Sequence, residues 1–407
     1  MLYFKNGDLA NTYHVSLRTV LNWIEATKKG KLDLVLHQQG PRAYIANTSR
    51  NVARIEQLVE EGRKYRNTRG LKTVTPRPEF YELYTQEQIY DIVRNLEISH
   101  EIPRQYNYFD GGADHWDEYA TRLSQEEGAN SLTSTQRLLE KNQSYIGSLL
   151  AHYKRVNIID IGVGNCLPVK EFLGDFLEKG VLGRYIGVDI SDKMLKIAQR
   201  NIKKWFGEKI KFESHKLDIN HDRFATLLSE EYIKDDSEST ANLILVFGGT
   251  LGNLRSPNDA FRAIHESMGI SDYLFYAKKL DSKTTRRYFD FNIDPSKPTI
   301  APVHKLALDF LNIDKSLYDV EMGFDKDNQQ RYVRIRLKLA LSIEFLFQKG
   351  KRIVRFNKGD TILLWRSWHQ SALDVVNQLD QNDFYTLHTS QTDDQEYMLT
   401  ISRVKCE

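Results

Sequence analysis

The chain has 407 residues, enough for two or three domains with buried cores. Its hydrophobic content of 41% is normal for a folded globular protein and argues against a disordered chain. It contains no run of eighteen apolar residues, and Cys166 and Cys406 are too few for a disulfide framework or a metal cluster, so we expect a cytoplasmic protein without a membrane span or a metal.

Charge is distributed unevenly along the chain. Residues 1–75 carry thirteen Lys or Arg and six Asp or Glu, so their net charge is 13 − 6 = +7. The whole chain carries +2, which leaves 2 − 7 = −5 for the other 332 residues. This asymmetry predicts an N-terminal module that faces a polyanion, joined to a mildly acidic body.

The first thirty residues have the pattern of two short helices joined by a tight turn. We expect the first helix around Leu9, a turn over His14 to Ser16, and a second helix over 17–27. Ser16 can cap the second helix. The small and apolar side chains that a helix-turn-helix packs together are Ala10, Val15, Val20 and Trp23.

A β-hairpin is expected next, over residues 32–46, with its tip near 39–41. Residues 1–62 therefore resemble the winged helix-turn-helix domain of MerR and excisionase-type proteins, with His14 at a turn position where many relatives carry glycine. The resemblance implies DNA binding and is compatible with a homodimer. The side chains expected to meet DNA are Ser16, Arg18, Thr19, Asn22 and Arg42. The alternative is a small helical module for dimerisation or substrate gating.

Residues 63–78 are basic and end in a proline-containing stretch, which predicts an exposed linker. Residues 79–150 are expected to form a helical cap, with helices over 86–96, 117–123 and 134–152. A segment rich in aromatic residues and glycine, Tyr106–Trp116, lies between the first two helices. It is expected to cap a cofactor cleft, with Tyr108 lining the substrate site. Simple packing of Tyr108 and Trp116 on a sheet is the alternative.

Residues 151–280 contain the motif that carries most information. The apolar run 156–161 ends at a turn with Gly162 and Gly164, and a second apolar run ends at Asp189. This order of strand, glycine turn, helix and strand predicts a nucleoside cofactor, with the carboxylate on the ribose hydroxyls. A pyrophosphate cradle needs a third glycine, but Leu167 stands there, so S-adenosylmethionine (SAM) is the expected cofactor.

Two further strands complete this part of the sheet. One is followed by Asp218, placed to meet an adenine amine, and the other runs from Ala241 into a second glycine-rich turn. The fold class is thus α/β, with a Rossmann-like class I methyltransferase sheet; an ordinary doubly wound sheet punctuated by glycine is the alternative. The expected cofactor-binding residues are Asp160, Gly162, Gly164, Asn165, Asp189, Asp218 and Gly248.

The C-terminal part, residues 281–407, changes to a period of two. Apolar residues alternate from Tyr332 to Glu344, which predicts one long strand with a single buried face. Further strands are expected over 353–357 and 397–404, and a helix over 374–379. We expect a β-rich substrate-binding subdomain over the mouth of the cofactor domain.

From about residue 100 to 405 the chain resembles the histidine-specific methyltransferase family, whose known member makes trimethylhistidine in ergothioneine synthesis. The resemblance rests on 160–165, 188–190, the sequence Gly-Gly-Thr-Leu-Gly-Asn at 248–253, and the turn 358–360. It implies that Asn253 holds an amino-acid substrate and that Tyr288 corresponds to a substrate tyrosine. Ser367 matches the serine that recognises imidazole. Trp365 stands where the family has the accompanying glutamate, so histidine itself is not the expected acceptor.

The expected reaction is methyl transfer to an amine of a small molecule or peptide, oriented by Asn253, Tyr288 and Ser367. Trp365 and Trp368 are expected to face the developing ammonium through cation–π contact, or else to be core residues. Two other functions stay open. One is a SAM-sensing transcriptional regulator with an inactive methyltransferase domain, which the Trp365 replacement motivates. The other is methylation of DNA. This function is less well supported, because the chain has no Asn/Asp-Pro-Pro-Tyr-type motif after the fourth strand.

Overall fold

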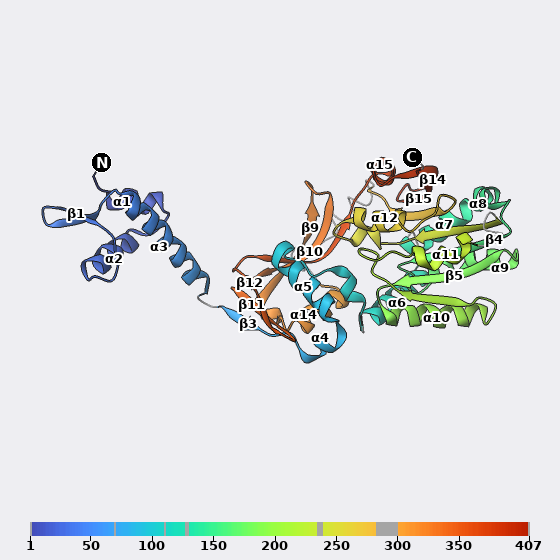
Figure 1. Cartoon of the computed structure of the whole chain (residues 1–407), viewed down its shortest axis with the longest axis horizontal. Coiled ribbons are helices and arrows are strands. Elements are labelled where there is room, and N and C mark those ends of the chain that lie inside the picture. The colour runs from blue at the N-terminus through green and yellow to red at the C-terminus, as the bar shows by residue number, and fades with distance from the viewer. Residues whose placement is uncertain are drawn as a thin grey trace. The chain divides into compact units, whose positions relative to one another are not determined.

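A computed structural model describes residues 2–68, 71–109, 111–126, 130–233, 239–281 and 300–405; for the helical residues 61–68 and 230–233 it describes the backbone alone. The chain divides into two compact units. The first comprises residues 1–73, 339–342 and 355–359, and the second comprises 74–338, 343–354 and 360–407. Figure 1 shows the ribbon of both units.

The first unit begins with two helices, a hairpin and a longer helix: α1 (Asn6–Thr12), α2 (Leu17–Lys28), β1 (Leu36–Gln39), β2 (Arg42–Ile45) and α3 (Ser49–Thr68). His14 adopts φ +50°, so this histidine takes the left-handed conformation that glycine supplies in many such turns. Ser16 caps α2, because its hydroxyl accepts the backbone N–H of Thr19 at 3.1 Å. The predicted packing residues Ala10, Val15, Val20 and Trp23 all contribute to one apolar cluster.

The second unit is built on a seven-stranded sheet with strand order β14-β15-β8-β7-β4-β5-β6. β15 runs antiparallel to both of its neighbours, and the other adjacent pairs are parallel. β4 lies inside the sheet between β7 and β5, where a strand buried on both faces requires a nearly continuous apolar run. The strands are β4 (Arg155–Ile161), β5 (Leu182–Asp189), β6 (Phe212–Lys216), β7 (Thr240–Val246), β8 (Tyr273–Lys279), β14 (Phe384–Gln391) and β15 (Tyr397–Val404).

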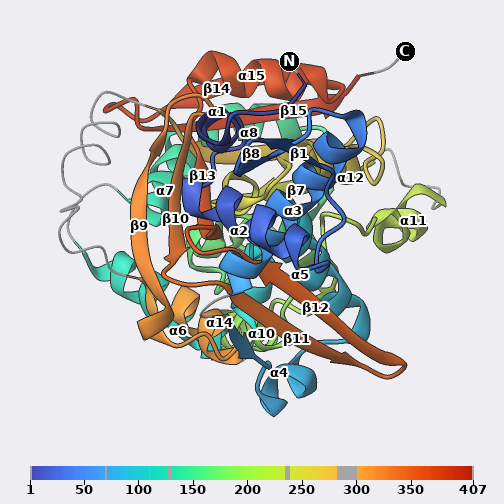
Figure 2. The ribbon, with the colours of Figure 1, turned by 90° about the vertical axis from the view of Figure 1, so that its left-hand side faces the viewer.

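Helices cover both faces of this sheet, which makes three layers (Figures 1 and 2). One face packs against α7 (Ser131–Lys141), α8 (Gln143–Leu150), α9 (Lys170–Glu178) and α10 (Asp192–Phe206). The other face packs against α11 (Ala225–Ile233), α12 (Pro257–His265) and α15 (Ala372–Gln381). The described helices are too short or too polar to cross a lipid bilayer.

Two small sheets and several helices complete the described chain. One sheet has the order β13-β10-β9, and the other has the order β12-β11-β3. Their strands are β3 (Lys72–Val74), β9 (Tyr318–Asp325), β10 (Gln330–Leu337), β11 (Leu341–Phe347), β12 (Gly350–Phe356) and β13 (Thr361–Trp368). The further helices are α4 (Pro78–Leu83), α5 (Gln86–Ser99), α6 (Gly111–Gln125) and α14 (Pro302–Phe310), with short 3₁₀ turns at Arg104–Tyr108, Leu167–Val169, Leu251–Asn253 and Lys315–Leu317.

The structure corrects three predictions of secondary structure. The long strand predicted over 332–344 is two strands, β10 and β11, which belong to different sheets. The helix predicted over 134–152 is interrupted at Asn142 into α7 and α8. The segment Tyr106–Trp116, predicted as a loop, ends inside α6, which begins at Gly111.

Candidate cofactor and acceptor site

The order of the strands places a switch point beside β4. From β4 the chain proceeds outward to β5 and β6, and then returns to place β7 and β8 on the other side of β4. In an open parallel sheet, ligands bind beyond the carboxyl ends of the strands at such a point. The turns after β4, β5 and β7 meet there, and these turns contain most of the predicted cofactor residues.

The turn after β4 needs glycine at two positions. Gly162 and Gly164 have φ values of +68° and +54°. A Cβ on Gly162 would lie 2.7 Å from Oγ1 of Thr250, a residue of the turn after β7. The two turns therefore touch, and a side chain at position 162 would separate them.

Asp189 ends β5 beside this turn. Its carboxylate accepts the backbone N–H of Ser191 at 3.0 Å and also interacts with the backbone N–H of Gly164. Burial raises the pKa of Asp189 to about 6, while these backbone N–H groups oppose the shift. The carboxylate is thus held by the turn after β4, at the position expected for a ribose ligand.

Asp160 lies in β4 beneath the turn, and its side chain is buried. Tyr185 of β5 donates its hydroxyl to Asp160 Oδ2 at 3.0 Å and lies 3.4 Å from Sγ of the buried Cys166. Burial raises the pKa of Asp160 to about 7, and the bond from Tyr185 opposes this shift. Asp160 therefore contacts protein groups that support the turn, and a direct cofactor contact through its side chain has no support in this geometry.

Two other predicted cofactor residues are occupied by local contacts. Asn165 is buried; its amide donates to Asp117 of α6 at 3.0 Å, and its side-chain oxygen accepts the backbone N–H of Leu167 at 3.3 Å. Asp218 follows β6 and is half-buried, and its Oδ1 accepts both the backbone and the side-chain N–H of Asn220. Asn165 thus anchors the turn, while the Asp218 carboxylate is engaged with Asn220 two residues further on.

The glycine-rich turn after β7 forms the other side of the site. Gly248 has φ +71°. A Cβ on Gly249 would lie 2.7 Å from Nδ2 of Asn253, so the asparagine side chain folds back over its own turn. Asn253 is half-buried and ends the 3₁₀ turn Leu251–Asn253.

The strand β13 carries the remaining predicted acceptor residues. Trp368 donates its indole N–H to the carbonyl of Leu254 at 2.8 Å, which joins the end of β13 to the turn that holds Asn253. Ser367 and Trp365 are half-buried on the same strand. Val333 of β10 lies opposite Trp365, and Arg334 lies opposite Leu363. β13 therefore has a β-bulge at Leu364, which has no partner on β10.

Trp365 already has a cation over its ring. The guanidinium carbon of Arg331 lies 5.5 Å from the centre of a Trp365 ring, and Arg331 pairs with Ser367 across the sheet. A cage for a substrate ammonium at Trp365 would have to displace Arg331. Tyr288 lies outside the described residues.

The cap segment reaches the same edge of the sheet. The backbone carbonyl of Tyr108 accepts a hydrogen bond from the hydroxyl of Ser191 at 2.7 Å. The phenol oxygen of Tyr108 accepts one from the Nε–H of Arg104 at 3.0 Å. Tyr108 is thus close to Asp189 by way of Ser191. Nε1 of Trp116 would lie 3.3 Å from a Cβ on Gly164. The sequence did not predict Trp116 as a cofactor-binding residue, although its position in an aromatic segment expected to cap the cofactor cleft was a signal.

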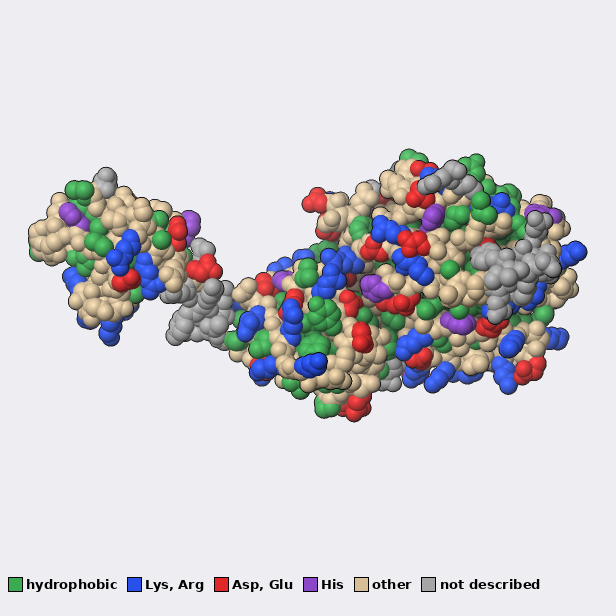
Figure 3. All heavy atoms as spheres, viewed as in Figure 1, with side chains coloured by type: hydrophobic (Ala, Val, Ile, Leu, Met, Phe, Trp, Pro, Cys, Tyr) green, Lys and Arg blue, Asp and Glu red, His purple; other side chains and the backbone are tan. Residues whose placement is uncertain are grey.

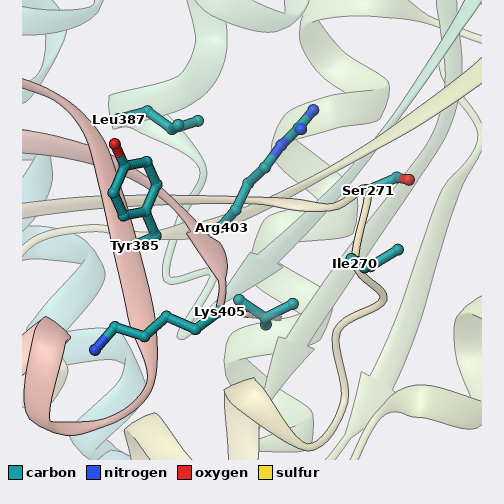
Figure 4. Close-up of a pocket in the computed structure, with 7 residues that line it drawn as sticks. Ile270, Ser271, Tyr385, Leu387, Arg403 and Lys405 are labelled. Atoms are coloured by element: carbon teal, nitrogen blue, oxygen red, sulfur yellow. The ribbon is translucent and has the colours of Figure 1, made fainter. Parts of the chain in front are cut away.

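An open pocket of about 660 Å³ lies elsewhere, lined by Ile270, Ser271, Tyr385, Leu387, Arg403, Val404 and Lys405. In Figure 4, Tyr385 and Lys405 lie across from Ile270 and Ser271. Ile270 and Ser271 precede β8, so the pocket is at the amino end of that strand. The turns described above are at the carboxyl ends of the parallel strands, and the pocket is separate from them.

The predicted DNA-facing residues of the first unit lie on α2 and at the start of β2. Arg18, Asn22 and Arg42 are exposed, and Thr19 is half-buried. Ser16 is exposed, but its hydroxyl is engaged with the backbone and hydroxyl of Thr19.

Residues 88–290, about half of the chain, match the family model described as histidine-specific, SAM-dependent methyltransferase. The match covers β4 to β8 and their turns but ends before Trp365, Ser367 and Trp368. No curated protein is similar enough to the chain to count as a match.

Several solved structures are distantly similar. A SAM-dependent methyltransferase from Clostridium acetobutylicum has 10% identity and a TM-score of 0.40, with 72% of this chain and 99% of that chain covered. The CcbJ methyltransferase from Streptomyces caelestis has 12% identity and a TM-score of 0.33, with coverages of 72% and 96%. The 1,6-didemethyltoxoflavin-N1-methyltransferase from Burkholderia thailandensis has 10% identity and a TM-score of 0.35, with coverages of 80% and 92%.

The family match and the turns of the site lead to the same class of protein. The turn after β4 has positive φ at Gly162 and Gly164, and the carboxylate of Asp189 lies beside it. The chain therefore belongs to the SAM-dependent methyltransferases whose family model matches residues 88–290, and its cofactor is S-adenosylmethionine.

Proposed function

We propose that the protein is an N-methyltransferase that acts on an amine of a small molecule or peptide, and that its first unit binds DNA. The observation that carries the catalytic part is the meeting of three turns at the switch point. Gly162 touches Thr250, and Gly164 interacts with Asp189, so the turns after β4, β5 and β7 surround one position.

The cofactor would be held by the first two turns. Asp189 would accept the ribose hydroxyls, and Gly162 and Gly164 would let the backbone approach the amino-acid end. Gly248, in the turn after β7, and Asp218, in the turn after β6, would border the same space. S-adenosylmethionine supplies a methyl group made electrophilic by a sulfonium.

The acceptor would bind between the turn after β7 and the end of β13. The bond from Trp368 to Leu254 supports this placement, because it brings Ser367 and Asn253 onto neighbouring segments. The acceptor nitrogen must present a lone pair about 3 Å from the methyl carbon, in line with the C–S bond. As the N–C bond forms, the C–S bond breaks, S-adenosylhomocysteine leaves as a neutral thioether, and the nitrogen releases a proton to solvent. Asn253, Ser367 and Tyr288 are the residues proposed to orient the nitrogen.

Trp365 argues against histidine as the acceptor. A tryptophan cannot accept the imidazole N–H, and Arg331 already lies over its ring. We infer an acceptor whose recognition uses Asn253 and Ser367 without an imidazole-binding carboxylate at position 365.

The DNA-binding part rests on the first unit. It combines a capped α2 bearing exposed Arg18 and Asn22, a following hairpin bearing exposed Arg42, and a net charge of +7 over residues 1–75 (13 − 6). A helix of this kind can enter the major groove while the hairpin contacts the backbone.

One experiment addresses the catalytic proposal. The full-length protein is incubated with SAM and a panel of α-amino acids, polyamines and short peptides, and S-adenosylhomocysteine is quantified. The protein should bind S-adenosylhomocysteine in calorimetry, Asp189→Ala should abolish that binding, and at least one amine should be turned over. Unchanged binding by Asp189→Ala would refute the ribose assignment.

A second function is favoured by the occupied ring of Trp365: a regulator that senses SAM through an inactive domain. It predicts that no acceptor is turned over and that DNA binding by the full-length protein changes when SAM is added. Turnover of an amine, with DNA affinity independent of SAM, would reject this alternative.

A further inference from the structure

The helix α6 is fastened by Asp117 and Asp114 to the turn after β4 and to α10. Asp117 accepts the amide of Asn165 at 3.0 Å and the guanidinium of Arg200 at 2.9 Å. Asp114 pairs with Lys193. Lys193 and Arg200 belong to α10, along which Lys and Arg side chains gather in Figure 3. These contacts fix α6 against both the turn after β4 and the helix after β5.

Trp116 lies between these two anchors. Its ring is 6.3 Å from that of Tyr108 and 5.6 Å from that of Tyr119, and it packs against a cluster of Ala113, Met194 and Ile197. Nε1 is the indole atom nearest to Gly164, at 3.3 Å from the position that a Cβ would take. The N–H of Trp116 is therefore held at the turn after β4, on a half-buried ring.

An indole N–H only donates, and a partly buried one usually finds an acceptor. Within the described ranges, no residue accepts a hydrogen bond from Trp116. The backbone N–H of Gly164 interacts with Asp189, so it does not serve the amino-acid end of the cofactor. The ribose hydroxyls are matched to the Asp189 carboxylate, whereas the carboxylate of the amino-acid end still needs donors at this turn.

We propose that Trp116 is a cofactor-binding residue whose indole N–H donates to the amino-acid carboxylate of S-adenosylmethionine. The proposal rests on the cofactor site proposed above and adds the residue that selects the intact amino-acid end. Trp116 would thus distinguish S-adenosylhomocysteine from nucleosides that lack this end.

The test compares two probes by calorimetry: S-adenosylhomocysteine, which has the carboxylate, and methylthioadenosine, which does not. Trp116→Phe keeps an aromatic ring and removes the donor. This substitution should weaken the affinity for S-adenosylhomocysteine about tenfold or more and change the affinity for methylthioadenosine by less than about twofold. The matched control is Trp205→Phe, at the far end of α10 under the ammonium of Lys170, which should bind both probes as the wild type does.

A second readout follows the indole itself. Addition of S-adenosylhomocysteine should change the tryptophan fluorescence of the wild type and of Trp205→Phe, and this change should be lost in Trp116→Phe. Equal weakening of both probes would overturn the carboxylate assignment, as would unchanged affinity in Trp116→Phe. Failure of the wild type to bind either probe would instead refute the proposed cofactor site, so the two failures are distinguishable.

Discussion

The indole N–H of Trp368 donates to the carbonyl of Leu254 at 2.8 Å, and this bond joins β13 to the turn after β7. The two residues are 114 positions apart in the sequence. Asn253 precedes Leu254 and Ser367 precedes Trp368, so the bond joins the two segments that carry the residues proposed to orient the acceptor.

Removing this bond should affect the acceptor more than the cofactor. Trp368→Phe leaves the Leu254 carbonyl without the indole donor and should lower the free energy of unfolding by about 1 kcal/mol. It should raise the KM for the acceptor while the Kd for S-adenosylhomocysteine stays within about twofold. Urea denaturation, steady-state kinetics and calorimetry measure these three quantities. A large change in cofactor affinity alone would contradict the proposed division of the site.

Cofactor affinity should depend on pH through Asp189. Burial raises the pKa of its carboxyl to about 6, and the ionised form is the one that accepts two ribose hydroxyls. Affinity for S-adenosylhomocysteine should therefore fall as pH drops below about 6, by up to about tenfold per pH unit, and level off above about 7. Asp189→Asn keeps the shape and cannot ionise, so its weaker binding should lack this step. Calorimetry between pH 5 and 8 provides the comparison, and an identical pH profile in both proteins would exclude Asp189 as the titrating group.

The contact between the turns after β4 and β7 predicts a steric cost at Gly162. Gly162→Ala adds a Cβ 2.7 Å from Thr250 Oγ1 on a backbone with φ +68°. The expected loss is about 2–4 kcal/mol of unfolding free energy, together with weaker cofactor binding. Gly180→Ala is the matched control, because Gly180 has φ +67° and nothing lies within 4 Å of its Cβ position.

Gly180→Ala should therefore cost only the backbone strain, about 1–2 kcal/mol. Adding Thr250→Ala to Gly162→Ala should recover part of the difference between the two single variants. Equal losses in Gly162→Ala and Gly180→Ala would mean that the turns do not touch in solution.

The first unit makes a separate prediction about DNA. Binding of the full-length protein to a DNA duplex should weaken steeply with salt, since phosphate contacts release counterions. Arg18→Ala on the exposed face of α2 should weaken it, whereas Arg223→Ala, which loses a pair with Glu266 in the second unit, should not. Fluorescence anisotropy across a salt series measures both affinity and slope. Salt-independent affinity would reject a DNA-binding first unit.

Local signals predicted much of the fold. The apolar run of β4, the glycines that follow it and Asp189 at the end of β5 depend on neighbouring residues, and the structure places them together. The start of α2 after Ser16 and the strand β15 over Tyr397–Val404 also follow from local capping and periodicity.

The change of sheet near Leu339 and the bulge at Leu364 could not be predicted from the sequence, because the apolar residues around them follow a pattern typical of a continuous strand. Leu337 and Leu341 keep the same period of two, but Leu339 between them is only half-buried and the chain changes sheets there. The bulge at Leu364 likewise turns Trp365 and Ser367 relative to the first half of β13. The change of sheet and the bulge are both decided by strand pairing: β10 pairs with β9 and β13, and β11 pairs with β12. Such pairing depends on residues far away in the sequence.

The sequence by itself determined the class of cofactor, because a glycine turn and a carboxylate at the ends of successive strands constrain backbone space and hydrogen bonding locally. Only the tertiary structure decided which side chains come together at the proposed cofactor and acceptor site. Trp116 reaches Gly164 because α6 is fastened by Asp114 and Asp117, and Arg331 reaches Trp365 because β10 pairs with β13. These contacts arise from packing between segments that are distant in the chain, and no local pattern of residues encodes them.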